Sequence, residues 1–265
     1  MANKPRKHLV IPDTQIKPGV SLDHIEWIAK YATEKTPDVI VIIGDWADMP
    51  SLSSYDVGKK AFEGRKYVAD IEVANKALAL LMGPIEAEIR RRVELHCKRW
   101  NPELHVTLGN HEERIMRAIN EDRKLEGLIH PADIRFKEFG WTVHPFLKPV
   151  VIDGVAYCHY FTSGVMDRPI TTARALLNKQ HMSCFAGHLQ DRDIAYGKRA
   201  DGTRITGIIC GACYQHDEDY MSPQGNKVWR GVYMLNEVQD GSLDEMPVSL
   251  SFLKERYGKT EKEQA

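Results

Sequence analysis

Apolar residues occur along this chain in short runs that end at a glycine or a polar residue, a pattern typical of buried strands in an α/β fold. Residues 38–43 form an almost unbroken β-branched run, as expected of a central parallel strand that is covered on both faces. Residues 8–12 and 104–108 form two similar runs. We therefore predict three buried strands in the first half of the chain.

Segments with helical spacing separate these runs. Residues 22–32 predict a helix that ends at Thr36-Pro37, residues 68–100 predict a longer helix broken near Gly83-Pro84, and residues 114–130 predict a third. Residues 51–66 are rich in Ser, Lys and Gly and predict a loop. The remaining predicted elements are a helix at 171–179, strands at 141–144, 150–152, 155–158, 183–186, 203–210 and 228–235, and a tight hairpin turn at Asp153-Gly154.

Composition bounds the class of protein. The 265 residues are 43% hydrophobic and 28% charged, which favours one large α/β domain over residues 1–253, followed by a charged, frayed tail at 254–265. The net charge of −1 gives no global field that favours nucleic acid or an acidic membrane. Basic residues gather at 90–99, and they form either a solvated helix face or a surface that contacts a phosphate backbone.

The five cysteines are scattered through apolar runs, which indicates reduced thiols rather than a disulfide framework. Cys210 and Cys213 form a lone CxxC pair, for which small buried residues are the expected role rather than zinc or redox chemistry. The basic start of the chain lacks the apolar run of a signal peptide, and no segment has the apolar length of a membrane helix. We expect a cytoplasmic protein with no membrane contact.

Polar side chains follow five of the predicted strands, at the rim where open α/β sheets bind ligands. They are Asp13, Gln15, Asp45, Asp48, Asn110, His111, His159, His188 and Gln190. Oxygen and imidazole donors without a thiolate suit Mn²⁺, Fe or Zn²⁺ more than a structural zinc. A carboxylate such as Asp45 can bridge two ions held about 3.5–4 Å apart. The alternative for the stretch after residue 108 is structural, with Asn110 as a helix N-cap and Glu113 completing a capping box.

These motifs resemble the calcineurin-like metallophosphoesterase superfamily, whose pattern in order is D-x-H, G-D-x-x-D, G-N-H-[E/D], a lone His and G-H-x-H. The chain has Asp13-Thr-Gln15, Gly44-Asp-Trp-Ala-Asp48, Gly109-Asn-His-Glu112, His159 and Gly187-His-Leu-Gln190. The resemblance spans about residues 8–190. It implies a four-layer αββα sandwich with a dinuclear metal site at the strand tips.

The resemblance also implies a role for each residue. Asp13 would bind the first metal, Asp45 would bridge both, and Asn110, His159 and His188 would complete the second. His111 would lie beside the phosphate, where it stabilises transition-state charge or protonates the leaving oxygen, with Asp48 orienting its imidazole.

The chain departs from the family pattern at Gln15 and Gln190, which stand where the family has the two histidines of the first metal. A glutamine carbonyl oxygen is a harder and weaker donor than imidazole, so the first site would favour Mn²⁺ or Mg²⁺ and bind it loosely. Alternatively, the first site holds no metal and the protein is mononuclear or inactive.

Two absent arginines narrow the class of substrate. The Ser/Thr phosphatase branch has the patterns G-D-x-V-D-R-G and R-G-N-H-E, but this chain has Met49 and Leu108 in place of both arginines. A protein phosphatase is therefore not the expected function. The GNHEER stretch and residues 220–231 look like small phosphoesterases found in bacteriophage genomes, which would place the protein in the host cytoplasm.

For Tyr220 and Trp229 we weigh core packing against base stacking and favour packing. Residues 51–66 and 112–140 are expected to wall the cleft.

We therefore expect a metal-dependent phosphoester hydrolase with two divalent ions, Mn²⁺ first and Mg²⁺, Fe or Zn²⁺ as alternatives. It would act as a phosphodiesterase or nuclease on DNA, RNA or nucleotides through a metal-activated hydroxide. Two alternatives stay open: a phosphomonoesterase on a small metabolite, and a non-catalytic phosphate-binding protein derived from the fold.

Overall fold

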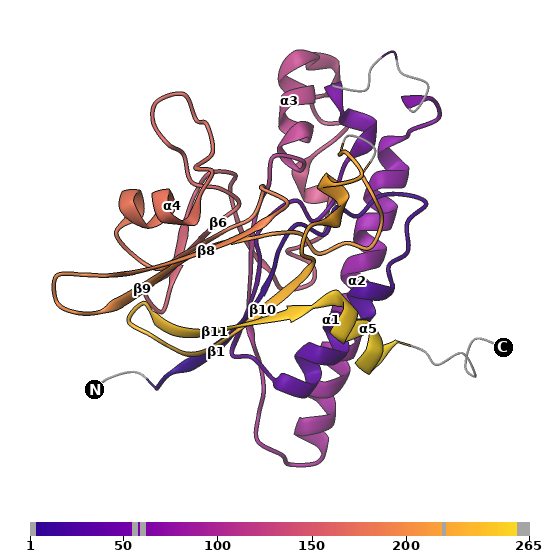
Figure 1. Cartoon of the computed structure of the whole chain (residues 1–265). Coiled ribbons are helices and arrows are strands. Elements are labelled where there is room, and N and C mark those ends of the chain that lie inside the picture. Colours follow the sequence, from indigo (N-terminus) through magenta and orange to yellow (C-terminus); the bar gives the residue numbers. More distant parts are fainter. Residues whose placement is uncertain (1–3, 55–57, 59–61, 219–220, 259–265) are drawn as a thin grey trace.

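The computed structural model describes residues 4–54, 58, 62–218 and 221–258 (Figure 1). Over these residues the chain is a mixed α/β protein with two mixed sheets and five α-helices. The first sheet has the order β11-β10-β1-β2-β3-β4, and the second has the order β5-β6-β7-β9-β8.

In the first sheet, the four strands from β1 to β4 are parallel, and β10 and β11 extend the sheet as antiparallel neighbours on the β1 side. These strands are β1 (Arg6–Ile11), β2 (Val39–Ile42), β3 (Glu103–Thr107), β4 (Thr142–His144), β10 (Gly231–Gln239) and β11 (Ser242–Ser249). Because the strands are parallel, the carboxyl ends of β1, β2 and β3 meet at one edge of the sheet.

In the second sheet, the central strands β6, β7 and β9 are parallel, while β5 and β8 are antiparallel to their neighbours. The strands are β5 (Val150–Ile152), β6 (Val155–Cys158), β7 (Cys184–Ala186), β8 (Arg192–Lys198) and β9 (Arg204–Cys210). Asp153 and Gly154 join β5 to β6 with φ angles of 48° and 81°, which is the tight two-residue hairpin that the sequence predicted.

Three apolar clusters hold the elements together. Helices α1 (Asp23–Lys35), α2 (Tyr67–Glu94) and α5 (Leu250–Tyr257) pack on one face of the first sheet. The other face packs on the second sheet, and α4 (Ala173–Gln180) covers the outer face of the second sheet. Along β1 the alternation is visible directly, since Leu9 and Ile11 contact the helices while Val10 lies between the sheets.

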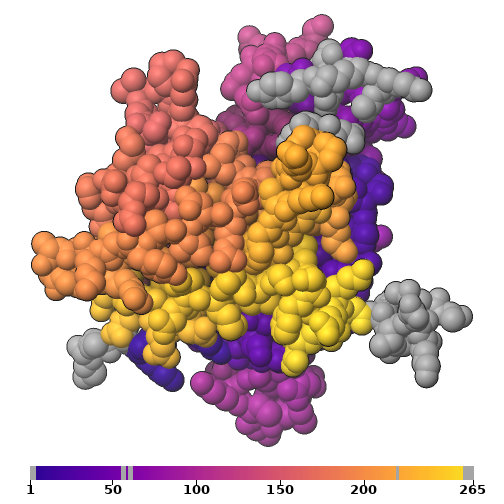
Figure 2. All heavy atoms as spheres, viewed as in Figure 1, coloured from indigo at the N-terminus to yellow at the C-terminus, as the bar shows by residue number. Residues whose placement is uncertain are grey.

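The segment between β6 and α4 and the segment around α3 (Glu113–Glu121) form two projections on the same face of the molecule, as Figure 2 shows.

Among the described residues, no helix has the length and apolar character needed to cross a membrane. Four of the five cysteines are buried free thiols, including Cys210 and Cys213, as the sequence predicted; Cys97 is exposed.

The structure corrects the predicted helix boundaries. The predicted break near Gly83-Pro84 is wrong: α2 runs through both residues and then ends at Glu94, short of the predicted end at residue 100. Both residues lie on the exposed side of the helix, while Leu81 and Ile85 pack on the sheet to either side of them. Packing therefore holds the helix together across the proline.

The predicted helix at 114–130 is also too long, because α3 ends at Glu121. Asp122 caps the next turn instead, accepting a hydrogen bond from the backbone N–H of Lys124 at 3.0 Å. The capping-box alternative is wrong as well, since the N-cap of α3 is Glu112, with no side-chain cap.

The C-terminal segment is more ordered than predicted. Residues 254–257 belong to α5 rather than to a frayed tail, and Arg256 forms an ion pair of 2.9 Å with Glu34 of α1. Residues 259–265 of the predicted tail lie outside the described residues. In the predicted loop at 51–66, Pro50–Leu52 forms a 3-10 turn, and residues 55–57 and 59–61 lie outside the described residues.

Candidate metal centre

Side chains from both sheets converge where five strands end. Asp13 and Gln15 follow β1, Asp45 and Asp48 follow β2, Asn110 and His111 follow β3, His159 follows β6, and His188 and Gln190 follow β7. Each of these strands has at least one parallel neighbour in its own sheet, and the residues follow its carboxyl end. The structure thus brings together all nine residues that the sequence singled out.

Glycines allow these segments to approach closely. A Cβ on Gly109 would lie 2.1 Å from Oδ1 of Asp45, and a Cβ on Gly187 would lie 2.2 Å from Oδ1 of Asp13. Any side chain at either position would displace a carboxylate. The backbones of Gln15, Asp45 and His188 are in the left-handed region, with φ angles of 45°, 48° and 67°. Such conformations are costly for these residues and tend to gather at functional sites.

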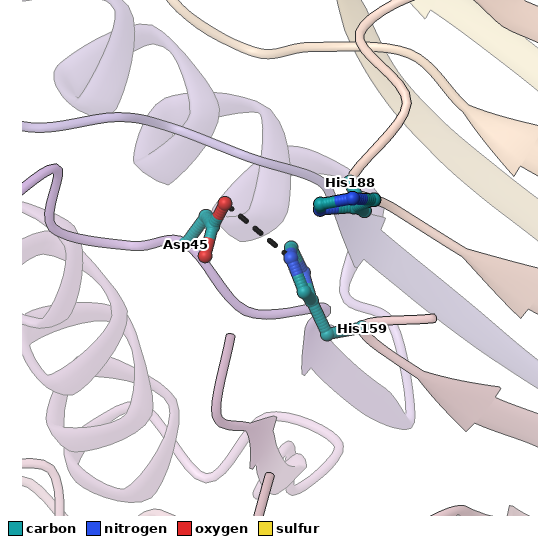
Figure 3. A group of neighbouring side chains, drawn as sticks. All are labelled: Asp45, His159 and His188. Carbon is teal, nitrogen blue, oxygen red and sulfur yellow. Dashed lines mark ion pairs between the residues drawn. The ribbon is translucent and has the colours of Figure 1, made fainter. Parts of the chain in front are cut away.

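Asp45, His159 and His188 form a group whose ligand-type atoms all lie within 4.8 Å of one another (Figure 3). Nε2 of His159 lies 3.3 Å from Oδ2 of Asp45. Oδ1 of Asn110 lies 2.9 Å from Nε2 of His159 and 2.8 Å from Nδ1 of His188. Ligands about 2.1 Å from one ion and about 90–110° apart lie roughly 3.0–3.4 Å from each other. These three separations are close to this range, so Asp45, Asn110, His159 and His188 are candidate ligands of one divalent cation.

His159 is oriented by the backbone of β2. Its Nδ1 donates to the carbonyl oxygen of Ile43 at 2.9 Å, and this leaves Nε2 to face Asp45 and Asn110. Burial alone would lower the pKa of His159, but the negative charge of Asp45 raises it to about 10. Burial and the charge of His159 together lower the pKa of His188 to about 4, so His188 is neutral and able to act as a ligand.

The two glutamines hold the carboxylates that would serve the other ion. Nε2 of Gln190 donates to Oδ2 of Asp13 at 3.1 Å, and Nε2 of Gln15 donates to Oδ2 of Asp45 at 3.3 Å. The Oε1 atoms of both glutamines are buried without a hydrogen-bond partner. Gln15 and Gln190 thus carry two unpartnered oxygen donors, a donor type that suits a hard divalent cation.

The two carboxylates differ strongly in acidity. Burial is the main reason why the pKa of Asp13 is raised to about 7; His159 opposes the shift and the charge of Asp45 adds to it. Asp45 is also fully buried, but the positive charges of His111 and His159 hold its pKa well below the usual range. Asp45 is therefore the anion around which the group is assembled.

His111 and Asp48 form a second pair beside this group. Nδ1 of His111 lies 2.9 Å from both Oδ1 and the carbonyl oxygen of Asp48, and its Nε2 lies 3.7 Å from Oδ2 of Asp45. Burial would lower the pKa of His111, but Asp45 and the hydrogen bond to Asp48 raise it. The imidazole is thus fixed, with Nε2 on the side of the Asp45 carboxylate.

Glu112 holds the backbone of the site, and sequence reasoning missed this role. Its buried carboxylate accepts hydrogen bonds from the N–H groups of Gly109 at 2.7 Å, Ala47 at 2.9 Å and Asp45 at 3.0 Å. It thereby ties the loop after β2 to the loop after β3. In the sequence, a glutamate at the start of a charged segment cannot be told from an exposed residue of a helix's first turn.

Further residues missed by the sequence analysis surround the histidines. The ring of Tyr160 lies 4.7 Å from that of His188 by ring centroids, and Phe146 packs on Tyr160 at 5.5 Å. On the other side, Nζ of Lys17 lies 3.4 Å from Oδ2 of Asp48 and 2.7 Å from Oε2 of Glu218. Burial raises the pKa of Asp48, but His111 and Lys17 lower it further than burial raises it.

Trp229 is the one of the two late aromatic residues that the structure describes. Trp229 packs against the cluster between the sheets, with its ring 5.3 Å from that of Tyr233, and Arg192 lies over it at 5.1 Å. This is the packing role that the sequence analysis favoured for Trp229. Tyr220 lies outside the described residues.

In the basic stretch at 90–99, Arg91 and Arg92 both form ion pairs with Glu88.

Comparisons with known proteins identify no family for this chain. No family model matches the chain, and no curated protein matches it. One similar solved structure is TT1561 of Thermus thermophilus, with 11% identity over 92% of this chain and 99% of that chain, and a TM-score of 0.34. Another has 12% identity, covers 92% of this chain and 100% of that chain, and has a TM-score of 0.35. Likeness at this level carries no argument about fold or function.

Proposed function

We propose that this chain is a metal-dependent phosphoester hydrolase of the calcineurin-like metallophosphoesterase superfamily, with the αββα sandwich of that superfamily. The observation that carries the proposal is the convergence of Asp45, His159 and His188 within 4.8 Å, beside the His111–Asp48 pair. The ligand group alone could serve many metalloproteins. A fixed acid–base imidazole next to it favours hydrolysis of an anionic ester.

The donor sets divide between two ions. Asp45, Asn110, His159 and His188 would hold one of them, while Asp13, Asp45, Gln15 and Gln190 would hold the other. Mn²⁺ is the ion we propose first, because one of the two sets consists of oxygen donors alone, and Mg²⁺, Fe and Zn²⁺ follow. Divalent ions bound there would lower the pKa of a water molecule and neutralise phosphate oxygens.

The residues of the chain have separate parts in this reaction. Nε2 of His111 delivers a proton to the leaving oxygen, and the carboxylate of Asp48 accepts the Nδ1–H so that Nε2 stays directed at the substrate. Glu112 fixes the backbone on which Asp45 is placed. The substrate we propose is a phosphodiester of DNA, RNA or a nucleotide, because the chain lacks both arginines of the Ser/Thr phosphatase branch.

The test is hydrolysis of bis-p-nitrophenyl phosphate and of p-nitrophenyl phosphate by metal-stripped protein with Mn²⁺, Mg²⁺, Zn²⁺ or no addition. We expect metal-dependent cleavage that is faster with the diester. Asp45→Asn should abolish it, and His111→Gln should lower kcat by about a hundredfold to ten-thousandfold, the usual range for a lost general acid. Faster cleavage of the monoester would instead support the phosphomonoesterase alternative.

A non-catalytic phosphate-binding role is the second candidate, and one observation favours it. The amides of Gln15 and Gln190 already donate to Asp45 and Asp13, so both carboxylates are partly satisfied without a cation. Binding of inorganic phosphate with no turnover under any of the four metal conditions would support this role and contradict the hydrolase.

A further inference from the structure

Arg114 lies at the edge of the candidate site, on the first turn of α3. Its guanidinium is mostly buried, with 13% of the side chain exposed. One edge is fixed to the loop after β2, because Nη1 donates to the carbonyl oxygens of Asp48 at 2.6 Å and Met49 at 3.2 Å. The position of the positive charge is therefore set by the same loop that carries the catalytic carboxylates.

The other edge of the guanidinium is directed at His111. Nη2 of Arg114 lies 3.1 Å from Nε2 of His111, while Nδ1 of the same ring is occupied by Asp48. An arginine can only donate, so Nη2 donates a hydrogen bond to Nε2 in this structure, and both atoms lie at the same point of the site. An anionic oxygen beside them would accept from Nη2, and such charge-assisted hydrogen bonds are the strong ones.

Arg114 forms an ion pair of 3.5 Å with Asp48 through Nη1, and the other nearby cations are paired with protein groups at other atoms. Nζ of Lys17 forms ion pairs with Glu218 and Asp48. Nη2 of Arg117 donates to the carbonyl oxygen of Asn110 at 2.8 Å. Among these three, Arg114 is the one whose donors reach the atom of His111 that faces the proposed substrate.

We propose that Arg114 binds the phosphate group of the substrate, donating from Nη2 to a non-bridging oxygen next to His111. This inference rests on the proposed function and adds to it the residue that holds the anion. The chain has Met49 and Leu108 where the phosphatase branch has arginines, and Arg114 brings a guanidinium to the same loop from α3. Arg114 thus makes phosphate affinity depend on a residue outside those two positions.

A purely structural role would predict a different outcome. In that case Arg114 would only tie α3 to the loop after β2, and its loss would lower stability without changing anion binding selectively. Arg92 is a suitable control, since it also pairs with a carboxylate, Glu88, and donates to a backbone carbonyl, that of Lys98, but lies on α2.

The experiment compares wild type, Arg114→Lys, Arg114→Met and Arg92→Met. Binding of tungstate, as a phosphate mimic, is measured by calorimetry on the Mn²⁺-loaded proteins, KM and kcat on the better substrate, and stability by urea unfolding. We expect tungstate affinity to fall about tenfold to hundredfold in Arg114→Met, with a similar rise in KM. Arg114→Lys should recover part of the loss, and Arg92→Met should stay within about twofold of wild type.

Two outcomes would overturn the proposal. One is unchanged tungstate affinity in folded Arg114→Met. The other is loss of affinity in both Arg114 variants that tracks their loss of stability. Its failure can be told from failure of the proposed function: a hydrolase whose activity ignores Arg114 contradicts only this inference, whereas a protein that binds tungstate through Arg114 but never hydrolyses an ester contradicts only the hydrolase.

Discussion

Glu112 shows how much one buried side chain contributes at the residue scale. Its carboxylate accepts three backbone N–H groups, and replacing it with alanine would leave those donors buried without partners. We expect Glu112→Ala to lower the free energy of unfolding by about 3 kcal/mol or more. Urea denaturation would measure the loss. Glu121→Ala, at the exposed end of α3, should change stability by less than about 0.5 kcal/mol. Equal effects of the two changes would contradict this role.

Gln15 and Gln190 are the two residues at which this site differs from the family pattern that it resembles. Replacing both with histidine would supply two imidazole donors in place of two amide oxygens that are buried and unpartnered. We expect the double variant Gln15→His with Gln190→His to bind the first-site Mn²⁺ or Zn²⁺ at least about tenfold more tightly. Calorimetric titration of metal-stripped protein would resolve it, with the exposed Gln224→His as control. No gain over the parent would show that our account of the glutamines is wrong.

At the scale of elements, α2 contains a proline that costs it a hydrogen bond. Pro84 lies in the interior of a 28-residue helix, on its exposed side. Pro84→Ala should therefore restore a backbone donor without removing buried contacts, and we expect a gain of about 1–3 kcal/mol in the free energy of unfolding. Pro131→Ala is the matched control, because Pro131 begins a 3-10 turn, where a proline is favourable. A loss of stability in Pro84→Ala would mean that the proline is needed for the shape of the helix.

The two strands that the sequence missed are edge strands. β8 and β11 each pair with one neighbour only, and their burial alternates or is incomplete. β11 even contains Pro247. Such strands lack the continuous apolar run that made β2 recognisable, because one face or one edge lies in solvent. Central strands, by contrast, can be recognised in the sequence from their continuous apolar runs.

At the scale of the whole molecule, the proposed metal site would couple ion binding to proton release. Without an ion, the pKa of His159 is raised to about 10, and that of Asp13 to about 7. Both groups therefore hold a proton at pH 6, and a cation must displace it before it can bind. We expect the apparent affinity for Mn²⁺ to increase about tenfold or more per pH unit between pH 6 and 8, with proton release detected by calorimetry in buffers of different ionisation enthalpy. Mn²⁺ binding that is independent of pH would contradict the displacement of these protons by the ion.

The metal-free protein should show the opposite trend in its own stability. The stabilisation from protonated His159 is fully present below the unfolded pKa of about 6.5 and is lost as the pH rises through about 10. Asp13 acts in the same direction at lower pH, because its raised pKa favours the protonated folded state until the pH passes about 7. The urea midpoint of metal-stripped protein should therefore fall between pH 6 and 9, and saturating Mn²⁺ should reverse the trend.

The sequence by itself determined the central strands, the α/β class and the nine polar residues at strand ends, because apolar runs and turn glycines are local signals. It also placed the Asp153-Gly154 hairpin, whose turn type depends on two adjacent residues. Only the tertiary structure decided that α2 passes through Pro84 and that Glu112 and Arg114 hold the loop after β2. The contacts of Glu112 and Arg114 with that loop join residues more than 60 positions apart, and no local pattern in the chain records them.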